Sequence, residues 1–129
     1  MRTLIGISLA SALIAGTLAS SAWAAAGPGA SASASSCQLS TKEQRNLGAS
    51  YVTSLKVDNT TCAKGKGVTL AFNNCRTASG KPQGVCNRKV GNYTCTEHRY
   101  DAVPGVQYSS RVACSWGNKR VWSTYTQNT

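Results

Sequence analysis

Six cysteines constrain this chain of 129 residues more than any other feature of its sequence. In a short exported chain, an even number of cysteines is typical of a disulfide framework. A zinc site is the alternative, but there is no Cys-x-x-Cys pair and His98 is the only histidine. We therefore expect no metal and no cofactor, and three disulfides among Cys37, Cys62, Cys75, Cys86, Cys95 and Cys114.

The beginning of the chain has the pattern of an export signal. Arg2 precedes an apolar run over residues 4–18, and Ala22-Trp23-Ala24 follows as a small-x-small cleavage site. A retained membrane anchor is the alternative, but a spanning helix needs about 20 apolar residues. We predict a signal peptide over residues 1–24, cleaved after Ala24 or, as a second choice, after Ala26, and a secreted, extracellular protein.

The remainder divides into a leader and a domain. Residues 25–36 consist of Ala, Ser, Gly and one Pro, which favours a flexible leader. Residues 37–129 are predicted to form a single disulfide-bonded domain. A domain of this size is marginally stable through its core alone, so disulfides contributing roughly 2–4 kcal/mol each are important.

The sequence does not fix how the cysteines pair, but it favours one arrangement. A Cys75–Cys86 disulfide would close a loop that has no core of its own. A Cys62–Cys95 disulfide would tie a helix to the sheet, and a Cys37–Cys114 disulfide would anchor the N-terminal segment.

Local patterns predict two elements in the first part of the domain. Ser40-Thr41-Lys42-Glu43 is a capping box, which predicts a helix over residues 41–47. Alternation over residues 51–57 predicts a strand, with Tyr51, Thr53, Leu55 and Val57 on one face.

The segment 61–76 fits two patterns. Val68, Ala71, Phe72 and Cys75 have helical spacing, whereas Val68, Leu70 and Phe72 also alternate as in a strand. We expect a helix over residues 61–76, capped by Thr60 or Thr61, and a turn-rich segment over residues 77–84.

The C-terminal part is rich in β-formers. Residues 93–99 are predicted to form a strand and residues 101–105 a loop. Residues 107–116 and 119–127 are predicted to form a hairpin around Gly117-Asn118, a pair suited to a two-residue turn.

Counting back from this turn pairs side chains on two faces. Cys114 and Val121, Val112 and Ser123, and Ser110 and Tyr125 would pair on the core face; Ala113 and Trp122, and Ser115 and Arg120, would pair on the other. The expected fold is α+β, with a small antiparallel sheet of about four strands, one or two short helices, and disulfides.

The chain is strongly basic. Its formal net charge is +10, and loss of Arg2 with the signal would leave 13 Lys and Arg against four acidic residues, or +9. Such a charge favours solubility or attraction to polyanions. We predict an anionic wall polymer or membrane surface as partner and no specific nucleic acid. The residues proposed to bind are Lys64, Lys66, Arg88, Lys89, Arg99, Lys119 and Arg120.

Aromatic residues are interleaved with these basic residues, as in surfaces that stack sugars or bases. Half of them are expected in the core of so small a domain. They are Tyr93, Tyr100, Tyr108, Trp116, Trp122 and Tyr125.

The sequence does not favour an enzyme. Glu97 and His98 are adjacent, so on a strand their side chains point to opposite faces. Ser109, Ser110 or Ser115 could supply a hydroxyl, but there is no Gly-x-Ser-x-Gly elbow. We expect a non-enzymatic protein.

Several motifs resemble those of small exported disulfide-bonded proteins of actinobacteria. The resemblance covers nearly all of residues 37–129 and implies export and fold rather than a chemistry. The motifs are Leu47-Gly48 with Tyr51-Val52-Thr53-Ser54-Leu55, Cys62-Ala63-Lys64-Gly65-Lys66, Tyr93-Thr94-Cys95-Thr96-Glu97 and Thr124-Tyr125-Thr126-Gln127-Asn128-Thr129.

A second, weaker resemblance is to the secreted subtilisin-inhibitor family. Cys95-Thr96-Glu97-His98-Arg99-Tyr100-Asp101 precedes a closing hairpin, as an exposed Cys-Thr-led segment does in that family. This resemblance implies a protease inhibitor as the alternative function. Its rigid, exposed loop would cover residues 96–104, with Arg99 entering the specificity pocket of a trypsin-like protease.

Overall fold

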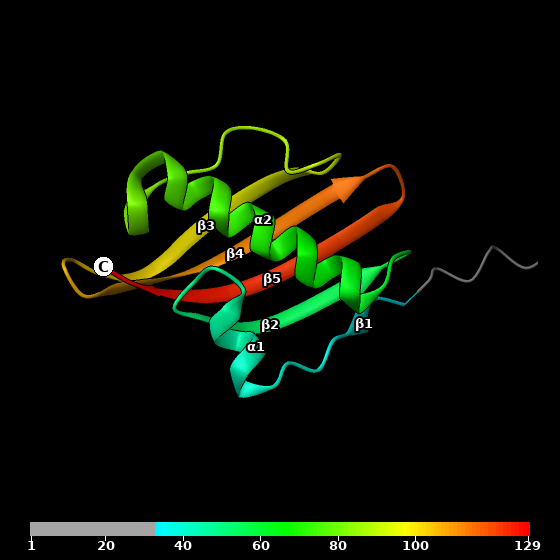
Figure 1. The fold of residues 1–129 in the computed structure, drawn as a ribbon, viewed down its shortest axis with the longest axis horizontal. Coiled ribbons are helices and arrows are strands. Elements are labelled where there is room, and N and C mark those ends of the chain that lie inside the picture. Colours follow the sequence, from blue (N-terminus) through cyan, green and yellow to red (C-terminus); the bar gives the residue numbers. More distant parts are fainter. Residues whose placement is uncertain (1–32) are drawn as a thin grey trace, which may run out of the picture.

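The computed structural model describes residues 33–129, which form a five-stranded antiparallel sheet with the order β1-β2-β5-β4-β3. The long helix α2 lies across one face of this sheet, and the short helix α1 lies beside β2 (Figure 1). This confirms the predicted α+β class. The predicted signal peptide lies outside the described residues. The elements are β1 (Ser35–Ser36), α1 (Thr41–Asn46), β2 (Tyr51–Asp58), α2 (Cys62–Gly80), the 3-10 turn η1 (Lys81–Gln83), β3 (Thr94–Val103), β4 (Gln107–Trp116) and β5 (Lys119–Asn128).

Both helices begin at the predicted caps. The Glu43 backbone amide donates to the Ser40 hydroxyl, and the Ser40 amide donates to the Glu43 carboxylate at 2.9 Å, which completes the capping box. In α2 the Thr61 hydroxyl accepts from the amide of Lys64 at 3.2 Å. The helix prediction for residues 61–76 is therefore confirmed over the strand alternative.

Helix α2 ends four residues later than predicted. Residues 77–80, expected in a turn, continue the helix to Gly80, and only Lys81–Gln83 form a tighter turn. The side chains of Thr77 and Ser79 donate to the backbone carbonyls of Asn73 and Arg76 within the helix. These polar residues thereby support the last turn instead of ending the helix.

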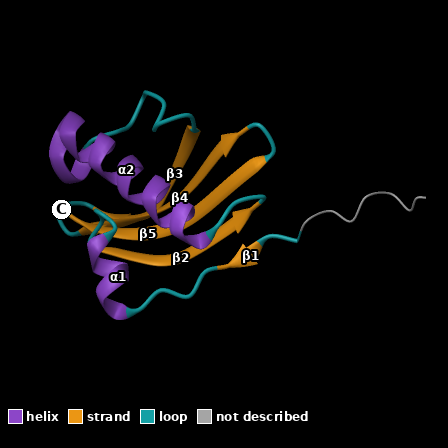
Figure 2. Cartoon of the chain, turned by 45° about the vertical axis from the view of Figure 1, so that its right-hand side comes forward, coloured by secondary structure: helices purple, strands orange, loops and turns teal. Residues whose placement is uncertain are grey.

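The C-terminal hairpin has the predicted register. Cys114 lies opposite Val121 and Ser110 opposite Tyr125, and these four side chains are buried. They face α2, where Phe72 completes the centre of the core. Figure 2 shows α2 over one face of the sheet, and the alternate positions of the same strands, which are exposed or half-buried, belong to the other face.

Strand β2 departs from the predicted alternation. Val52 is buried and Tyr51 is exposed, although the sequence predicts Tyr51 and Thr53 on the same face as Leu55 and Val57. A β-bulge after Val52 is the cause, because one extra residue in a strand reverses the alternation on one side of the bulge.

Strand β3 is longer than predicted. It continues through residues 101–103, which were expected in a loop, and only residues 104–106 connect it to β4. The pairing of β3 with β4 changes register between Tyr100 and Val103. Asp101 has a φ of 49°, an irregularity that lets the strand continue past the position where the sequence pattern ends.

All six cysteines are paired, but only one predicted pairing is right. The observed disulfides are Cys37–Cys62, Cys75–Cys86 and Cys95–Cys114. The Cys62–Cys95 and Cys37–Cys114 predictions are wrong because the β3–β4 register places Cys95 directly opposite Cys114. Three disulfides are typical of a protein from an oxidising compartment.

The end of the predicted leader is ordered. Ser35–Ser36 form β1 by pairing with Val57 and Lys56 of β2, and the next residue, Cys37, donates its amide to the Leu55 carbonyl at 2.8 Å. Strand pairing uses backbone groups, so the small side chains that suggested flexibility do not prevent it.

Candidate binding groove

The structure divides the predicted binding residues into paired and unpaired cations. Lys66 forms an ion pair with Glu43, and Arg99 forms one with Glu97 at 2.9 Å. Hydrogen bonds from Lys66 and from Ser40 lower the pKa of Glu43 to about 2, so it stays ionised. The charges of Lys66 and Arg99 are therefore already neutralised within the domain.

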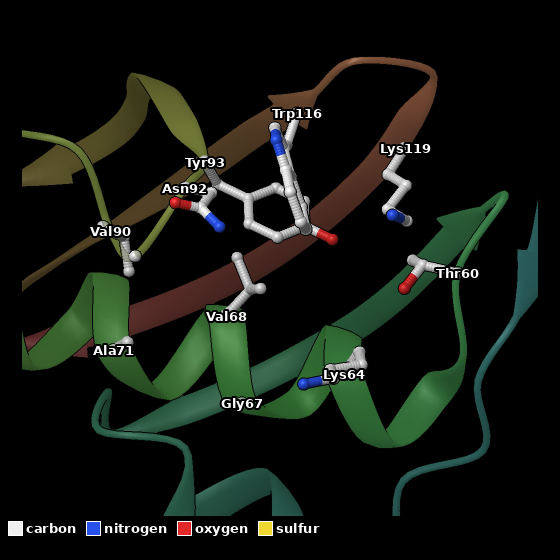
Figure 3. Close-up of a pocket in the computed structure, with 11 residues that line it drawn as sticks. Thr60, Lys64, Gly67, Val68, Ala71, Val90, Asn92, Tyr93, Trp116 and Lys119 are labelled. Carbon is white, nitrogen blue, oxygen red and sulfur yellow. The ribbon is translucent and has the colours of Figure 1, made fainter.

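Lys64 and Lys119 lie together although they are distant in the sequence. Lys64 is on the first turn of α2 and Lys119 begins β5, and both line a groove between the helix and the end of the hairpin (Figure 3). Within residues 33–129 neither lysine forms an ion pair with a carboxylate. This groove is the candidate functional site.

The other predicted binding residues lie elsewhere. Arg88 and Lys89 are exposed in the segment that follows the Cys75–Cys86 disulfide. Arg120 follows Lys119 on β5 and thus points to the other face of the sheet, where its guanidinium donates to the carbonyls of Gly117 and Lys119. The predicted cationic set is therefore not one surface.

The groove has a volume of about 400 Å³ and a largely apolar floor. Figure 3 shows Tyr93 and Trp116 on its sheet side and Val68 on its helix side. The rings of Tyr93 and Trp116 meet edge to face, with their centroids 5.8 Å apart. The Lys119 ammonium lies 4.2 Å from the centre of the Trp116 ring, an indole that is 45% exposed. The remaining lining residues are Thr60, Gly67, Ala71, Val90, Gly91 and Asn92.

Two local features build this groove. Along α2, Lys64, Val68 and Ala71 follow one another at helical spacing, so they share the face that borders the groove. On the opposite side, Val90 and Tyr93 form an isolated β-bridge around a tight turn, with Gly91 at a φ of 58°. This turn directs Tyr93 inward beside Trp116.

Comparison of the chain with known protein families, with curated proteins and with solved structures finds no match. The resemblances to exported actinobacterial proteins and to subtilisin inhibitors thus remain predictions.

A second set of charged and aromatic side chains lies between α2 and the sheet. Arg76 is fully buried. Its guanidinium donates to Asn73 Oδ1 at 2.9 Å, to the Pro82 carbonyl at 2.9 Å, to Tyr108 Oη at 3.1 Å and to Gln127 Oε1. These acceptors satisfy the buried cation, so Arg76 stabilises the fold and is not available to a ligand.

Glu97 is the carboxylate of this interior set. Burial opposes its ionisation, but hydrogen bonds from Arg99 and Tyr125 outweigh that effect, and the pKa of Glu97 lies below its ordinary value. Burial and the hydrogen bond to Glu97 raise the pKa of Tyr125 far above its usual range. Tyr125 therefore remains a hydrogen-bond donor, and the pair has no free base or nucleophile to offer.

The predicted inhibitory loop is wrong. Residues 96–103 belong to β3, which pairs with β4, and only residues 104–106 form a turn. Arg99 does not project into solvent, because it donates to the carbonyls of Gln83 and Gly84 and its guanidinium lies 4.5 Å from the centre of the Tyr108 ring. It cannot serve as the residue that enters a protease pocket without breaking these contacts.

Over residues 33–129 no group of three or more His, Cys, Asp and Glu side chains could hold a metal ion. In the same range no helix is long and apolar enough to cross a membrane.

Sequence reasoning named Lys64, Lys119, Tyr93 and Trp116 individually but did not place them together. The only signal for their proximity is tertiary. The hairpin turn must lie over the first turns of α2, and no local pattern specifies how a helix crosses a sheet.

Proposed function

We propose that this chain is a secreted, non-enzymatic binding protein for an anionic extracellular or envelope ligand, with the groove between α2 and the β4–β5 turn as its site. One observation carries the proposal. Lys64 and Lys119, which have no carboxylate partner in the described domain, line one groove with the exposed Trp116 and a largely apolar floor.

This combination favours a ligand that has both an acidic group and a ring or apolar part. An unpaired ammonium gains most from an anion that it meets beside a surface of low polarity. The exposed Trp116, which packs edge to face on the buried Tyr93, offers stacking and apolar contact for the rest of the ligand. A volume of about 400 Å³ accommodates a small molecule or the terminal group of a larger one.

The net charge of the chain supports the same partner. The formal charge of +10 over the full sequence attracts anions at long range and raises their rate of encounter with the surface. The groove then adds the short-range contacts that distinguish one anion from another.

The test uses an aromatic sulfonate, anilinonaphthalene sulfonate, as a probe that has both features. Its affinity is measured by fluorescence titration at several salt concentrations. The double variant Lys64→Gln/Lys119→Gln is compared with Lys42→Gln/Lys89→Gln, which removes two exposed lysines outside the groove. We expect the groove variant to bind about tenfold more weakly and the control to bind as the parent does.

A further variant separates charge from stacking. Trp116→Ala should weaken probe binding but leave its salt dependence unchanged, because both lysines are retained. Equal losses in the groove variant and the control variant would show that only overall charge attracts the probe, which would overturn the proposal. Soluble wall teichoic acid and phosphatidylglycerol vesicles, measured in the same way, then identify the natural class of partner.

A further inference from the structure

The face of the sheet that points away from α2 carries side chains that the groove does not use. Strand pairing places Lys56, Trp122, Ala113 and Thr96 in one row across β2, β5, β4 and β3. The next row consists of Ser54, Thr124, Arg111 and His98. We call these two rows the open face, because no described helix lies over it (Figure 2).

The open face is hollowed. A depression of about 470 Å³ is lined by the side chains of both rows. Six of the eight residues are exposed, and Trp122 and Thr124 are half-buried. With strands about 4.8 Å apart, four strands give a surface roughly 14 Å across. That is wide enough for several units of a linear polymer.

The charge of this surface is positive and unpaired. Lys56 and Arg111 form no ion pair with any carboxylate of residues 33–129. Glu97 borders the depression, but its carboxylate lies on the helix side of the sheet, where Tyr125 and Ser110 donate to it. An anion on the open face therefore meets two cations and no opposing carboxylate within the two rows.

The aromatic residues of this face are arranged in two ways. His98 and Tyr100 stack on each other, with ring centroids 6.4 Å apart and planes at 15°, and Arg111 lies 5.0 Å from the centre of the Tyr100 ring. Trp122 lies between Lys56 and Ala113, and the methyl group of Ala113 leaves space beside the indole. The open face thus offers one free aromatic ring, hydroxyl groups and two cations.

We infer that the open face binds a single chain of an acidic polysaccharide, with one sugar ring on Trp122, acidic groups at Lys56 and Arg111, and sugar hydroxyls at Ser54, Thr96 and Thr124. The hydroxyl-rich rows distinguish this partner from single-stranded nucleic acid, which binds through several aromatic rings that stack successive bases. Here His98 and Tyr100 already stack on each other, and only Trp122 is available.

This inference is independent of the proposed function, because the open face and the groove lie on opposite sides of the sheet and share no residue. A ligand in the groove and a polysaccharide on the open face could bind together. Variants of one surface therefore test it without altering the other.

The experiment measures binding of polygalacturonate by isothermal titration calorimetry, with neutral dextran and oligothymidylate for comparison. Lys56→Gln/Arg111→Gln should weaken polygalacturonate binding by about tenfold or more, and Trp122→Thr should also weaken it. Lys42→Gln/Lys89→Gln, which removes two exposed lysines outside both surfaces, should leave it unchanged. Each variant must retain the unfolding midpoint of the parent to within the error of the measurement.

Backbone amide shifts provide a second readout that does not depend on any variant. Polygalacturonate should perturb the amides around Lys56, Ala113 and Trp122 more strongly than those around Lys42 and Lys89. Tighter binding of oligothymidylate than of polygalacturonate at the same salt concentration would overturn the inference. So would equal losses in the open-face and control variants, or shift changes spread over the whole surface.

Discussion

The two faces of the sheet are built from alternate residues of the same strands, yet they treat polar side chains in opposite ways. The face under α2 buries Ser110, Gln127, Tyr125 and the guanidinium of Arg76, and each has hydrogen-bond partners. The open face carries Lys56 and Arg111 with no ion-pair partner among the described residues. Polarity alone therefore does not show which side chains of this domain are free to contact a ligand, and the contacts of each side chain must be compared.

The net charge of +10 overstates the number of cations that can contact a ligand. Three basic side chains, Lys66, Arg76 and Arg99, are held by contacts inside the domain. They are not available for contacts with a ligand. The cations that remain available in the groove and on the open face include Lys56, Lys64, Arg111 and Lys119.

The largest expected effect is the loss of the buried guanidinium. Arg76→Met should destabilise the domain by about 3–5 kcal/mol, because four acceptors beside a fully buried side chain lose their donor. Arg111→Met on the open face, the same change in chemistry, should alter stability by less than about 0.5 kcal/mol. Urea unfolding with the disulfides intact measures both values. Similar losses for the two variants would show that the faces do not differ as described.

The second largest effect concerns Glu97, the carboxylate on the face of the sheet under α2, which we call the covered face. Glu97→Gln should cost about 1.5–3 kcal/mol at neutral pH, because Arg99 and Tyr125 lose a charged acceptor. The folded-state pKa of Glu97 is lowered, so its contribution is complete above the unfolded pKa and is lost as the pH falls through the folded value.

Unfolding measured as a function of pH tests this sign. The difference in stability between the parent and Glu97→Gln should be constant above about pH 5 and should shrink as the pH is lowered further. Glu43 titrates in both proteins, so its effect cancels in the difference. A difference that grows on acidification would mean that the pKa of Glu97 is raised, contrary to the structure.

Local chemistry explains which parts of the fold could be predicted from sequence. The capping box at Ser40, the cap at Thr61 and the Gly117-Asn118 turn each depend on residues a few positions apart, and all are confirmed. The two faces of the hairpin followed directly from its turn, because side-chain alternation is fixed once the register is known.

The errors occur where distant segments decide the structure. The register of β3 against β4 sets the Cys95–Cys114 disulfide, and a bulge after Val52 decides which side chains of β2 are buried. Arg76 could not be recognised as buried, because its acceptors include residues up to Gln127. The groove was not predicted for the same reason, since it depends on how α2 crosses the sheet.

Two glycines of α2 provide a smaller test on opposite sides of one helix. A Cβ atom added at Gly65 would lie 2.6 Å from Val57 Cγ1 in the covered core, whereas one added at Gly67 would meet nothing within 4 Å. Gly67→Ala should stabilise the domain by up to about 1 kcal/mol through helix propensity. Gly65→Ala should be less stable than Gly67→Ala by about 1–3 kcal/mol because of overpacking.

Thermal unfolding of the two glycine variants, measured side by side, gives the difference in their stability. Because both changes add one methyl group to the same helix, the gain in propensity cancels in the comparison. Equal stabilities would imply that Val57 moves away without loss, and hence that the covered face is packed more loosely than its burial indicates.

The smallest expected effect compares one serine on each face. The Ser110 hydroxyl is fully buried and lies 3.1 Å from both Glu97 Oε1 and the His98 carbonyl, which share its single proton, so Ser110→Ala should cost about 0.5–1.5 kcal/mol. Ser54 is exposed on the open face, and Ser54→Ala should change stability by less than about 0.5 kcal/mol. If the open face binds polysaccharide, the order reverses in calorimetry with polygalacturonate. Ser54→Ala should then weaken binding while Ser110→Ala leaves it unchanged, because a hydroxyl can serve a ligand only when the fold has not already engaged it.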